Sequence, residues 1–388
     1  MAANVCLSDE HMRLGGTSFE SALYRYLFPP IFVIGVLGNV VNLCVLLSPT
    51  MRSRANNLLL ALAFADIAFL LAMLPHSMAN YSALAMNYAY RFVYLHSKLQ
   101  LTWLANWSSA TAIWIVMAVC VDRRMGIKSP LYSRKDWSAR KMAVVLLLIW
   151  TSTGLLTSYN FFGFHCFRSY YCKGTQLYSI CYSIASDRWV NNRTNPYSPA
   201  MREYVQMSIV ANVFLVVVLP MIAMAALNAA LLHELKKRGE DPLLKNNTSC
   251  CESRDRCQER KVAVTVSAIV CCFILTQGPS AITLVWNMAN GSSPTTNAFV
   301  YNLRSAANFL VIVGKATNFF LFCFCSAHFR KRVVQLCLRR WKHCASRGSA
   351  VGAKTVEESA LYSEFGSMVR DKRLTPPSTS SSLGATSI

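Results

Sequence analysis

Seven long runs of apolar residues alternate with short polar segments along this chain. They cover residues 26–48, 57–79, 99–122, 142–162, 205–233, 262–289 and 303–325. Each run is long enough to cross a bilayer as a helix, which takes about 20 residues. Because the bilayer offers the backbone no water, only helices or a closed barrel can span it, and these runs are too long for barrel strands. The pattern therefore predicts an all-α membrane protein built as a seven-transmembrane helix bundle.

The polar segments divide the chain around this bundle. We expect an extracellular N-terminal arm, a seven-transmembrane domain, a short amphipathic cytoplasmic helix and a disordered cytoplasmic tail, at residues 1–25, 26–328, 329–344 and 345–388. The third segment carries apolar side chains on one face and basic ones on another, which is typical of a helix lying on the membrane surface. The tail is too polar to bury a core of its own.

Composition and charge agree with a membrane protein and predict its orientation. Of the 388 residues, 54% are hydrophobic and 15% are charged, whereas roughly a quarter are charged in soluble chains. The net charge of +21 is concentrated after the first, third, fifth and seventh runs and in the tail, where 28 of the 39 Lys and Arg lie. Basic segments stay in the cytoplasm. We therefore expect a plasma-membrane protein with an extracellular N-terminus, and no binding of nucleic acid.

Modification signals fall on the predicted outer side. Asn80, Asn192 and Asn290 begin sequons and are candidate glycosylation sites. Cys6, Cys166, Cys172 and Cys181 are candidates for disulfides. Four cysteines allow three pairings, and the sequence does not choose among them. No spacing of metal ligands or nucleophiles indicates an enzyme, and no metal or cofactor is predicted.

Short motifs recur in order along the predicted helices. They are Gly38-Asn39, Asn57, Asp66, Asp122-Arg123-Arg124, Trp150, Pro220, Phe273, Pro279, Asn318, Phe322 and Phe329. In these residues the chain resembles the rhodopsin-like (class A) G-protein-coupled receptors. The stretches around Trp114 and Thr276-Gln277-Gly278-Pro279 are similar to invertebrate neuropeptide receptors of the FMRFamide-like group. The resemblance implies a receptor for an extracellular ligand, a short neuropeptide above all, that activates a heterotrimeric G protein by moving the inner ends of spans 3, 5 and 6.

The chain departs from the family pattern in the parts that switch. Arg124 stands where the family usually has Tyr, and Gln277 stands where it usually has Trp. Lys98 occupies the place of the usual cysteine, so the family's common disulfide from span 3 is absent. A non-signalling or decoy receptor is therefore the alternative function. A transporter is less favoured, because no internal repeat is visible.

The resemblance implies a switch at the inner end of the bundle. Arg123 would pair with Glu259 at the start of span 6 and hold the two helix ends together at rest. An agonist would then favour the separated state. The alternative is that Arg123 pairs only with the adjacent Asp122.

Asp66 and Lys315 are ionisable groups at membrane depth, and such groups usually face the bundle interior and pair. In the family the position of Asp66 faces that of Asn318 and often helps to bind sodium. We therefore expect the Lys315 ammonium to take the place of the sodium ion. The alternative is a protonated Asp66 and a lysine that points elsewhere. A retinal-binding opsin is disfavoured, because the opsin lysine would stand at Ile312.

The outer halves of the spans offer side chains for a ligand. The candidates are His76, Trp103, Asn106, Trp107, Gln277, Trp286, Asn287, Tyr301, Arg304 and Asn308. Aromatic and polar groups together suit a short peptide, although the tryptophans could equally be packing residues. Ala105 stands where amine receptors carry Asp, which disfavours a monoamine. The charge of the ligand stays open, since outer acids and a net basic outer surface point in opposite directions.

The tail carries candidate contacts for cytoplasmic partners. Its Ser and Thr residues invite phosphorylation and arrestin binding. Thr386-Ser387-Ile388 fits the carboxylate pocket of a PDZ-type domain. Cys337 and Cys344 are candidates for palmitoylation, which would add a second lipid anchor, and plain reduced thiols are the alternative.

Overall fold

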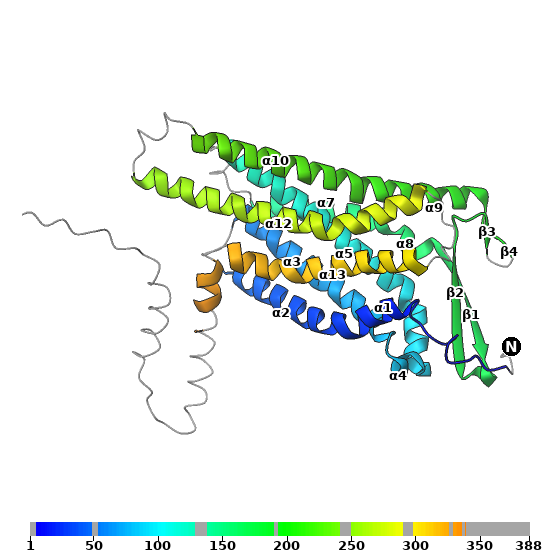
Figure 1. Ribbon diagram of the computed structural model, residues 1–388. Helices are drawn as coiled ribbons and strands as arrows, with labels where there is room; N and C mark the ends of the chain where they lie inside the picture. Colours follow the sequence, from blue (N-terminus) through cyan, green and yellow to red (C-terminus); the bar gives the residue numbers. More distant parts are fainter. Residues whose placement is uncertain are drawn as a thin grey trace, which may run out of the picture. The chain divides into compact units, whose positions relative to one another are not determined.

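The computed structural model describes residues 5–48, 53–128, 138–189, 193–240, 250–289, 298–325, 329–335 and 338. The chain forms two units, Met1–Val334 and Gln335–Ile388, and the labelled elements of Figure 1 belong to the first. Within the described residues, six helical stretches are long and apolar enough to cross a membrane: Ser18–Leu46, Arg54–Met78, Tyr88–Gly126, Ala139–Phe162, Pro199–Glu234 and Ser267–Trp286. α13 (Ala298–Cys325) adds a seventh long helix. The predicted all-α membrane fold is confirmed.

The first membrane helix begins earlier than the apolar pattern predicts. α1 (Ser18–Ala22) continues through a π-helical turn (Leu23–Leu27) into α2 (Phe28–Leu46), so the helix starts inside the predicted arm. The Thr17 hydroxyl accepts a hydrogen bond from the Glu20 backbone N–H at 3.2 Å. This cap satisfies one of the free donors of the first turn. The start is therefore set by a polar cap, which lies outside the apolar run.

The remaining helices are separated by loops or short turns, except that a second π-helical turn joins two of them. They are α3 (Arg54–Met78), α4 (Ser82–Ala85), α5 (Tyr88–Lys128), α7 (Ala139–Thr157), α8 (Tyr159–Phe162), α9 (Pro199–Asn212), the π-helical Val213–Val218, α10 (Leu219–Glu240) and α12 (Cys250–Ala289). Serine side chains cap α3, α7 and α9. α5 and α12 start eleven or more residues before the predicted spans, because the polar residues there continue the helix.

The long helices lie side by side in one bundle (Figure 1), and six of them contact one another in a closed series that leaves out α7. α2 contacts α3, α3 contacts α5, α5 contacts α10, α10 contacts α12, and α12 contacts α13, which returns to α2. α5 also packs against α7 and α12 and is therefore the central helix of the bundle. Large apolar side chains such as Leu155, Leu275 and Ile282 are exposed. In a membrane these side chains face lipid, where their exposure is favourable.

The loop after α8 folds into strands that the sequence did not predict. β1 (Phe164–Tyr171) pairs antiparallel with β2 (Gln176–Ser183), and a short pair, β3 (Arg188–Trp189) with β4 (Arg193–Thr194), follows. The β1–β2 turn passes through Cys172 and Lys173, whose φ values of 53° and 56° are left-handed. Residues other than Gly seldom adopt this conformation. Gly174, at φ 94°, is the one ordinary turn residue of this segment.

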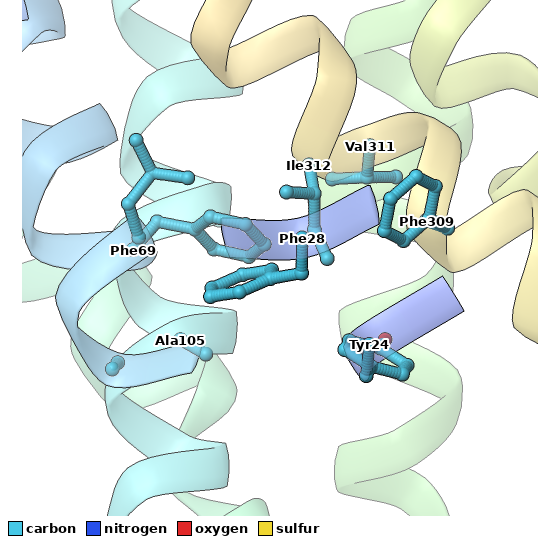
Figure 2. Packing of buried hydrophobic residues seen from close by; sticks show 9 residues of the cluster. Tyr24, Phe28, Phe69, Ala105, Phe309, Val311 and Ile312 are labelled. Atoms are coloured by element: carbon cyan, nitrogen blue, oxygen red, sulfur yellow. The ribbon is translucent and has the colours of Figure 1, made fainter. Parts of the chain in front are cut away.

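An apolar cluster joins the first, second, third and seventh membrane helices (Figure 2). Its buried members are Tyr24, Phe28, Phe69, Leu70, Ala72, Ala105, Phe309, Val311 and Ile312. Tyr24 meets Phe309 edge to face, with ring centroids 6.0 Å apart, an arrangement that aromatic pairs prefer. The cluster fixes these helices directly beside the polar site described next.

Candidate functional site

A buried carboxylate, that of Glu20, organises the end of the bundle that carries α1, α4 and the β1–β2 hairpin, here called the hairpin end. Glu20 is 8% exposed. Its Oε2 accepts hydrogen bonds from the Gly16 backbone N–H at 2.7 Å and from the Tyr301 hydroxyl at 2.8 Å. His76 Nε2 lies 3.8 Å from Glu20 Oε1. Glu20, Gly16, His76 and Tyr301 are called the Glu20 site below.

Packing holds both His76 and Gly16 in place. His76 Nδ1 lies 3.0 Å from the Tyr94 hydroxyl, and the Tyr24 ring meets the imidazole edge to face at 4.6 Å. Tyr24 belongs to the apolar cluster of Figure 2, so the cluster forms one wall of the site. A side chain on Gly16 would collide with the Tyr301 hydroxyl. Glycine is therefore needed for the backbone to approach the α13 helix this closely.

Two cations lie on the helices that border this site. Lys98 is one helical turn from Tyr94 on α5, and Arg304 is one turn from Tyr301 on α13. The Thr17 hydroxyl also donates to Asn302 Oδ1 at 2.7 Å, which joins α1 to α13. The Glu20 site therefore gathers donors and positive charge from α3, α5 and α13 around one carboxylate.

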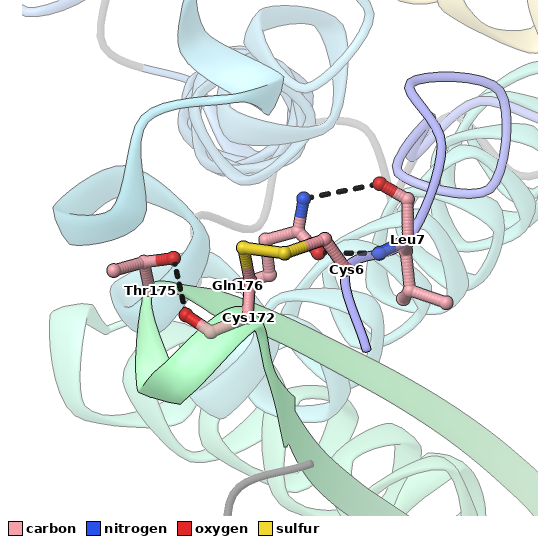
Figure 3. Close-up of a disulfide and its surroundings, with 5 residues drawn as sticks. All are labelled: Cys6, Leu7, Cys172, Thr175 and Gln176. Atoms are coloured by element: carbon pink, nitrogen blue, oxygen red, sulfur yellow. Dashed lines mark hydrogen bonds between the residues drawn. A yellow bond between two sulfur atoms is a disulfide. The ribbon is translucent and has the colours of Figure 1, made fainter. Parts of the chain in front are cut away.

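A disulfide fastens the arm before α1 to the hairpin, as Figure 3 shows. Cys6 is bonded to Cys172 at the turn between β1 and β2. The Leu7 backbone donates to Gln176 Oε1 at 2.7 Å, and Gln176 Nε2 donates back to the Leu7 carbonyl at 3.1 Å. The Cys172 backbone N–H donates to the Val5 carbonyl at 3.0 Å. The arm is thus held at two places, by this disulfide and by α1.

Arg91 clamps three segments of the hairpin end together. Its side chain is 1% exposed. Nε donates to the Leu177 carbonyl of β2 at 2.8 Å, and Nη1 donates to the carbonyls of Met12 in the arm at 2.5 Å and Ala85 in α4 at 2.8 Å. Carbonyl oxygens that receive such charge-assisted hydrogen bonds make the buried cation tolerable. Arg91 therefore fixes the arm, the first loop and the hairpin relative to one another.

A second buried carboxylate, Asp66, lies deep in the bundle. Asp66 and Lys315 are 0% and 1% exposed, and Lys315 Nζ lies 3.2 Å from Asp66 Oδ1. Asn318 Nδ2 donates to Asp66 Oδ2. The ammonium also lies 5.7 Å from the Phe69 ring centroid and 5.5 Å from that of Phe273, within the range of cation–π attraction. Since these two charged atoms make no hydrogen bond to a described residue, the ion pair itself compensates them.

At the opposite end of the bundle, Asp122 pairs with Arg54, a partner that the sequence did not predict. Asp122 Oδ1 lies 3.3 Å from Arg54 Nε at the start of α3, so Asp122 is engaged by a neighbouring helix. Arg123 Nε is buried and makes no hydrogen bond to a described residue. Glu259 belongs to α12, and its side chain is outside the described part of the structure.

The sequence profile of the family described as "Serpentine type 7TM GPCR chemoreceptor Srw" matches residues 28–340. The chain belongs to this family. The receptor is 36% identical over 338 residues to the Caenorhabditis elegans protein named "Putative G-protein coupled receptor F59B2.13", covering 86% of this chain and 77% of that protein. It is 26% identical over 338 residues to galanin receptor type 2 of Mus musculus, covering 86% of this chain and 81% of that receptor.

These relationships confirm the predicted rhodopsin-like resemblance. The protein is a signalling receptor in the membrane and not an enzyme, as the sequence indicated. The narrower resemblance to the FMRFamide-like group stays a prediction.

Two predicted ligand residues, Trp103 and Trp107, turn out to pack between helices of the receptor. Their rings stack at 5.2 Å, and their Nε1 atoms donate to the carbonyls of Gly154 at 3.4 Å and Trp150 at 2.8 Å in α7. A Cβ on Gly154 would lie 2.9 Å from the Trp107 ring, so the indole fills the space that glycine leaves. The packing interpretation of these residues is therefore the one that the structure favours.

Of the other predicted ligand residues, two belong to the Glu20 site and the rest do not. His76 and Tyr301 lie in the Glu20 site, and Arg304 stands exposed beside it. Asn106 is exposed and bonded within its own helix, Trp286 is 63% exposed, and Asn308 accepts a hydrogen bond from Ser280 at 3.0 Å. Gln277 is buried, and its Nε2 has no hydrogen-bond partner among described residues. The side chain of Asn287 is outside the described part.

The predicted glycosylation site Asn80 lies in a packed loop. It is 5% exposed, its Nδ2 donates to the His76 carbonyl at 2.9 Å, and its Oδ1 accepts from the Ser21 hydroxyl at 3.1 Å. A glycan on Nδ2 would break these two contacts. Glycosylation of Asn80 therefore stays a prediction that requires this loop to move away from α1.

The four outer cysteines form two disulfides, Cys6–Cys172 and Cys166–Cys181, the second across directly opposite residues of β1 and β2. Several other predicted sites lie outside the described residues: Asn192, Asn290, Cys337, Cys344 and Thr386-Ser387-Ile388. Of the predicted surface helix 329–344, residues 329–335 and 338 are described and are helical, and Phe329 is buried.

Sequence reasoning missed Glu20 and Arg91. A signal for Glu20 was present, since Thr17-Ser18-Phe19-Glu20 has the Thr-x-x-Glu spacing of a capping box. The carboxylate reaches the Gly16 N–H and the Tyr301 hydroxyl, 281 residues away, and no local pattern encodes that second partner. For Arg91 no sequence signal separates a buried guanidinium from an exposed one.

Proposed function

We propose that this receptor lies in the plasma membrane with its hairpin end outside, binds a short peptide there, and activates a heterotrimeric G protein at the opposite end. The basic segments after the first, third, fifth and seventh spans support this orientation. Two disulfides at the hairpin end support it too, because such bonds persist in oxidising surroundings. The similarity to galanin receptors supports a peptide ligand.

The Asp66–Lys315 ion pair is the observation that carries the switching mechanism. Both charges are buried, and they join α3 to α13, with Phe273 of α12 against the ammonium. Removing a buried charge from its partner is costly. The pair therefore favours discrete arrangements of the helices over gradual ones, as a bistable switch requires.

α13 connects the ligand side to this switch. It carries Tyr301 in the Glu20 site and also Lys315 and Asn318 beside Asp66. Tyr301 and Lys315 are about 21 Å apart along the axis, at roughly 1.5 Å per residue. A ligand that shifts or turns α13 at the hairpin end therefore acts on the ion pair through one rigid helix. The ligand must prefer the shifted state by a few kcal/mol, on the order of 5 kcal/mol for a complete shift.

In this proposal the Lys315 ammonium takes the place of the sodium ion that the family resemblance associates with Asp66. At the opposite end, Arg123 and Glu259 form the resting pair that separates when the G protein inserts. The buried Arg123 Nε without a described hydrogen-bond partner supports a role for this guanidinium beyond local packing.

The test is a G-protein activation assay in cells that express the receptor, run against a library of short peptides, amidated and free-acid. The controls are surface expression and the Arg123→Ala variant. A saturable response that this variant loses, at unchanged surface expression, is the expected result. Silence across the library, with the receptor on the surface, would favour the non-signalling or decoy alternative.

A further inference from the structure

We propose that the Glu20 site is a carboxylate-binding site, filled at rest by the receptor's own Glu20 and taken over by an acidic group of the ligand. The inference rests on the proposed function in taking the hairpin end as the side that meets ligand. It goes further in naming the chemistry of the ligand, whose charge the sequence leaves open.

The donor set of the site suits a carboxylate from any source. Tyr301 OH, the Gly16 N–H and His76 Nε2 converge on one carboxylate from 2.7 to 3.8 Å. Lys98, one turn from Tyr94 on α5, and Arg304, one turn from Tyr301 on α13, bring positive charge to the helices around the site. Neutral and cationic donors that converge in this way bind an anion strongly, because its hydrogen bonds are charge-assisted. Only Gly16 belongs to the same segment as Glu20, so the other donors stay in place when Glu20 leaves.

Glu20 is attached in a way that allows it to leave. It lies on α1, a helix of five residues that a π-helical turn separates from α2. Its side chain belongs to no apolar cluster, in contrast to Tyr24 one turn later, which the cluster of Figure 2 holds. Loss of the Glu20 contacts therefore loosens the attachment of α1 to α13, where the Thr17–Asn302 hydrogen bond remains, without dismantling the core.

Glu20 is a tethered competitor, because α1 continues through the π-helical turn into α2 and the Cys6–Cys172 disulfide holds the other end of the arm (Figure 3). A tethered group acts at an effective concentration on the order of millimolar or higher, even after it has left its site. A free small carboxylate at low concentration therefore loses the competition. A peptide that carries an Asp, a Glu or a free C-terminus wins when its other contacts with the hairpin end add to its affinity. The tether in this way gives selectivity for an acidic ligand with an extended contact surface.

The first experiment asks whether the emptied site accepts an external carboxylate, with acetate as the probe. The full-length Glu20→Ala variant, in lipid nanodiscs, is unfolded by heat in acetate and in chloride at equal ionic strength. Acetate at about ten times its Kd is expected to raise the Tm by about 2 °C over chloride. Wild type and Glu203→Ala, which removes an exposed acid, should show no difference between the two anions. Adding Tyr301→Phe to Glu20→Ala should reduce the acetate effect by half or more.

The second experiment keeps Glu20 and releases the disulfide end of the arm, so it does not depend on the stability of Glu20→Ala. In the Cys6→Ser/Cys172→Ser variant, amide hydrogen exchange at residues 16–21 is measured in acetate and in chloride. Competition predicts exchange that is several-fold faster in acetate, with no change at residues 62–70. Equal exchange in both anions, or a Glu20→Ala Tm that acetate does not raise, would overturn the proposal. Neither measurement involves signalling, so its failure is distinguishable from a failure of the receptor assay.

Discussion

The described part of the receptor contains two buried carboxylates that are compensated in different ways. Asp66 faces a full counter-charge, Lys315, deep among aromatic rings. Glu20 faces neutral donors and one histidine, collected from three segments near the end of the bundle. Loss of one partner at Asp66 strands an ion in an apolar interior, whereas loss of one partner at Glu20 leaves other donors in place.

Because of this difference, the Asp66–Lys315 pair is a fixed contact, whereas the contacts of Glu20 can be exchanged for others. The deep pair holds membrane helices together and resists replacement, because no competing ion from solvent can reach it without its own desolvation cost. The hairpin-end site is made of groups that water or a ligand can also satisfy. The first arrangement suits the switch and the second suits the place where a ligand acts.

The largest effect is expected for Lys315→Met. It strands the Asp66 charge and should lower the free energy of unfolding by about 3–5 kcal/mol, measured by thermal unfolding of the purified receptor and by its surface expression. Asp66→Asn with Lys315→Met should recover most of the loss, and Lys141→Met, at an exposed lysine, should have little effect. A double variant no better than the worse single one would show that the pair is not a unit.

Arg91→Ala should cost about 3 kcal/mol, because three carbonyls lose a charge-assisted donor. Hydrogen exchange should rise together in residues 5–12, 82–85 and 176–183, the three segments that Arg91 joins. Arg13→Ala, at an exposed arginine of the same arm, is the matched control. Faster exchange in only one segment would contradict the role of Arg91 as a common clamp.

Glu20→Gln should destabilise the receptor by about 1–2 kcal/mol, since the amide keeps one oxygen and loses the charge. The change at Lys315 should therefore be at least about one and a half times as large, and the comparison of the two sites rests on this ratio. Thermal unfolding in parallel with Glu203→Gln, which should stay within about 0.5 kcal/mol of wild type, provides the measurement. An effect of Glu20→Gln as large as that of Lys315→Met would remove the distinction between the sites.

Trp107→Phe should cost about 1 kcal/mol through loss of the hydrogen bond to the Trp150 carbonyl. The potency of an activating peptide should stay the same, because Trp107 packs against α7. Unfolding and dose–response curves on the same preparation test both statements. A tenfold loss of potency at unchanged stability would return Trp107 to the ligand site.

Ser82→Ala is expected to have the smallest effect. It removes the sequon of Asn80, whose side chain is buried beside the arm. The shift in electrophoretic mobility on glycosidase treatment should therefore be the same as for wild type. A smaller shift in the variant would mean that Asn80 carries a glycan and that the arm packs differently.

The sequence by itself determined the membrane fold and one of the two sites. Apolar runs of spanning length leave the backbone no alternative to helices, and charges within such runs are rare enough that Asp66 and Lys315 could be matched from the chain alone. The ligand pocket stays a prediction, because the sequence does not say whether a side chain on one helix points toward a neighbouring helix or toward a ligand. Trp103 and Trp107 point toward α7, because Gly154 leaves space for the Trp107 ring and α7 carbonyls accept hydrogen bonds from both indoles.

Only the tertiary structure decided the hairpin end. The pairing of Cys6 with Cys172, the contact of Arg91 with Met12 and the contact of Glu20 with Tyr301 join residues that are 166, 79 and 281 positions apart in the sequence. The membrane imposes no uniform requirement there, because water can satisfy any polar group that the protein does not. Which polar groups meet is then set by the turn of the hairpin and by the path of the arm, and neither has a periodic pattern in the sequence.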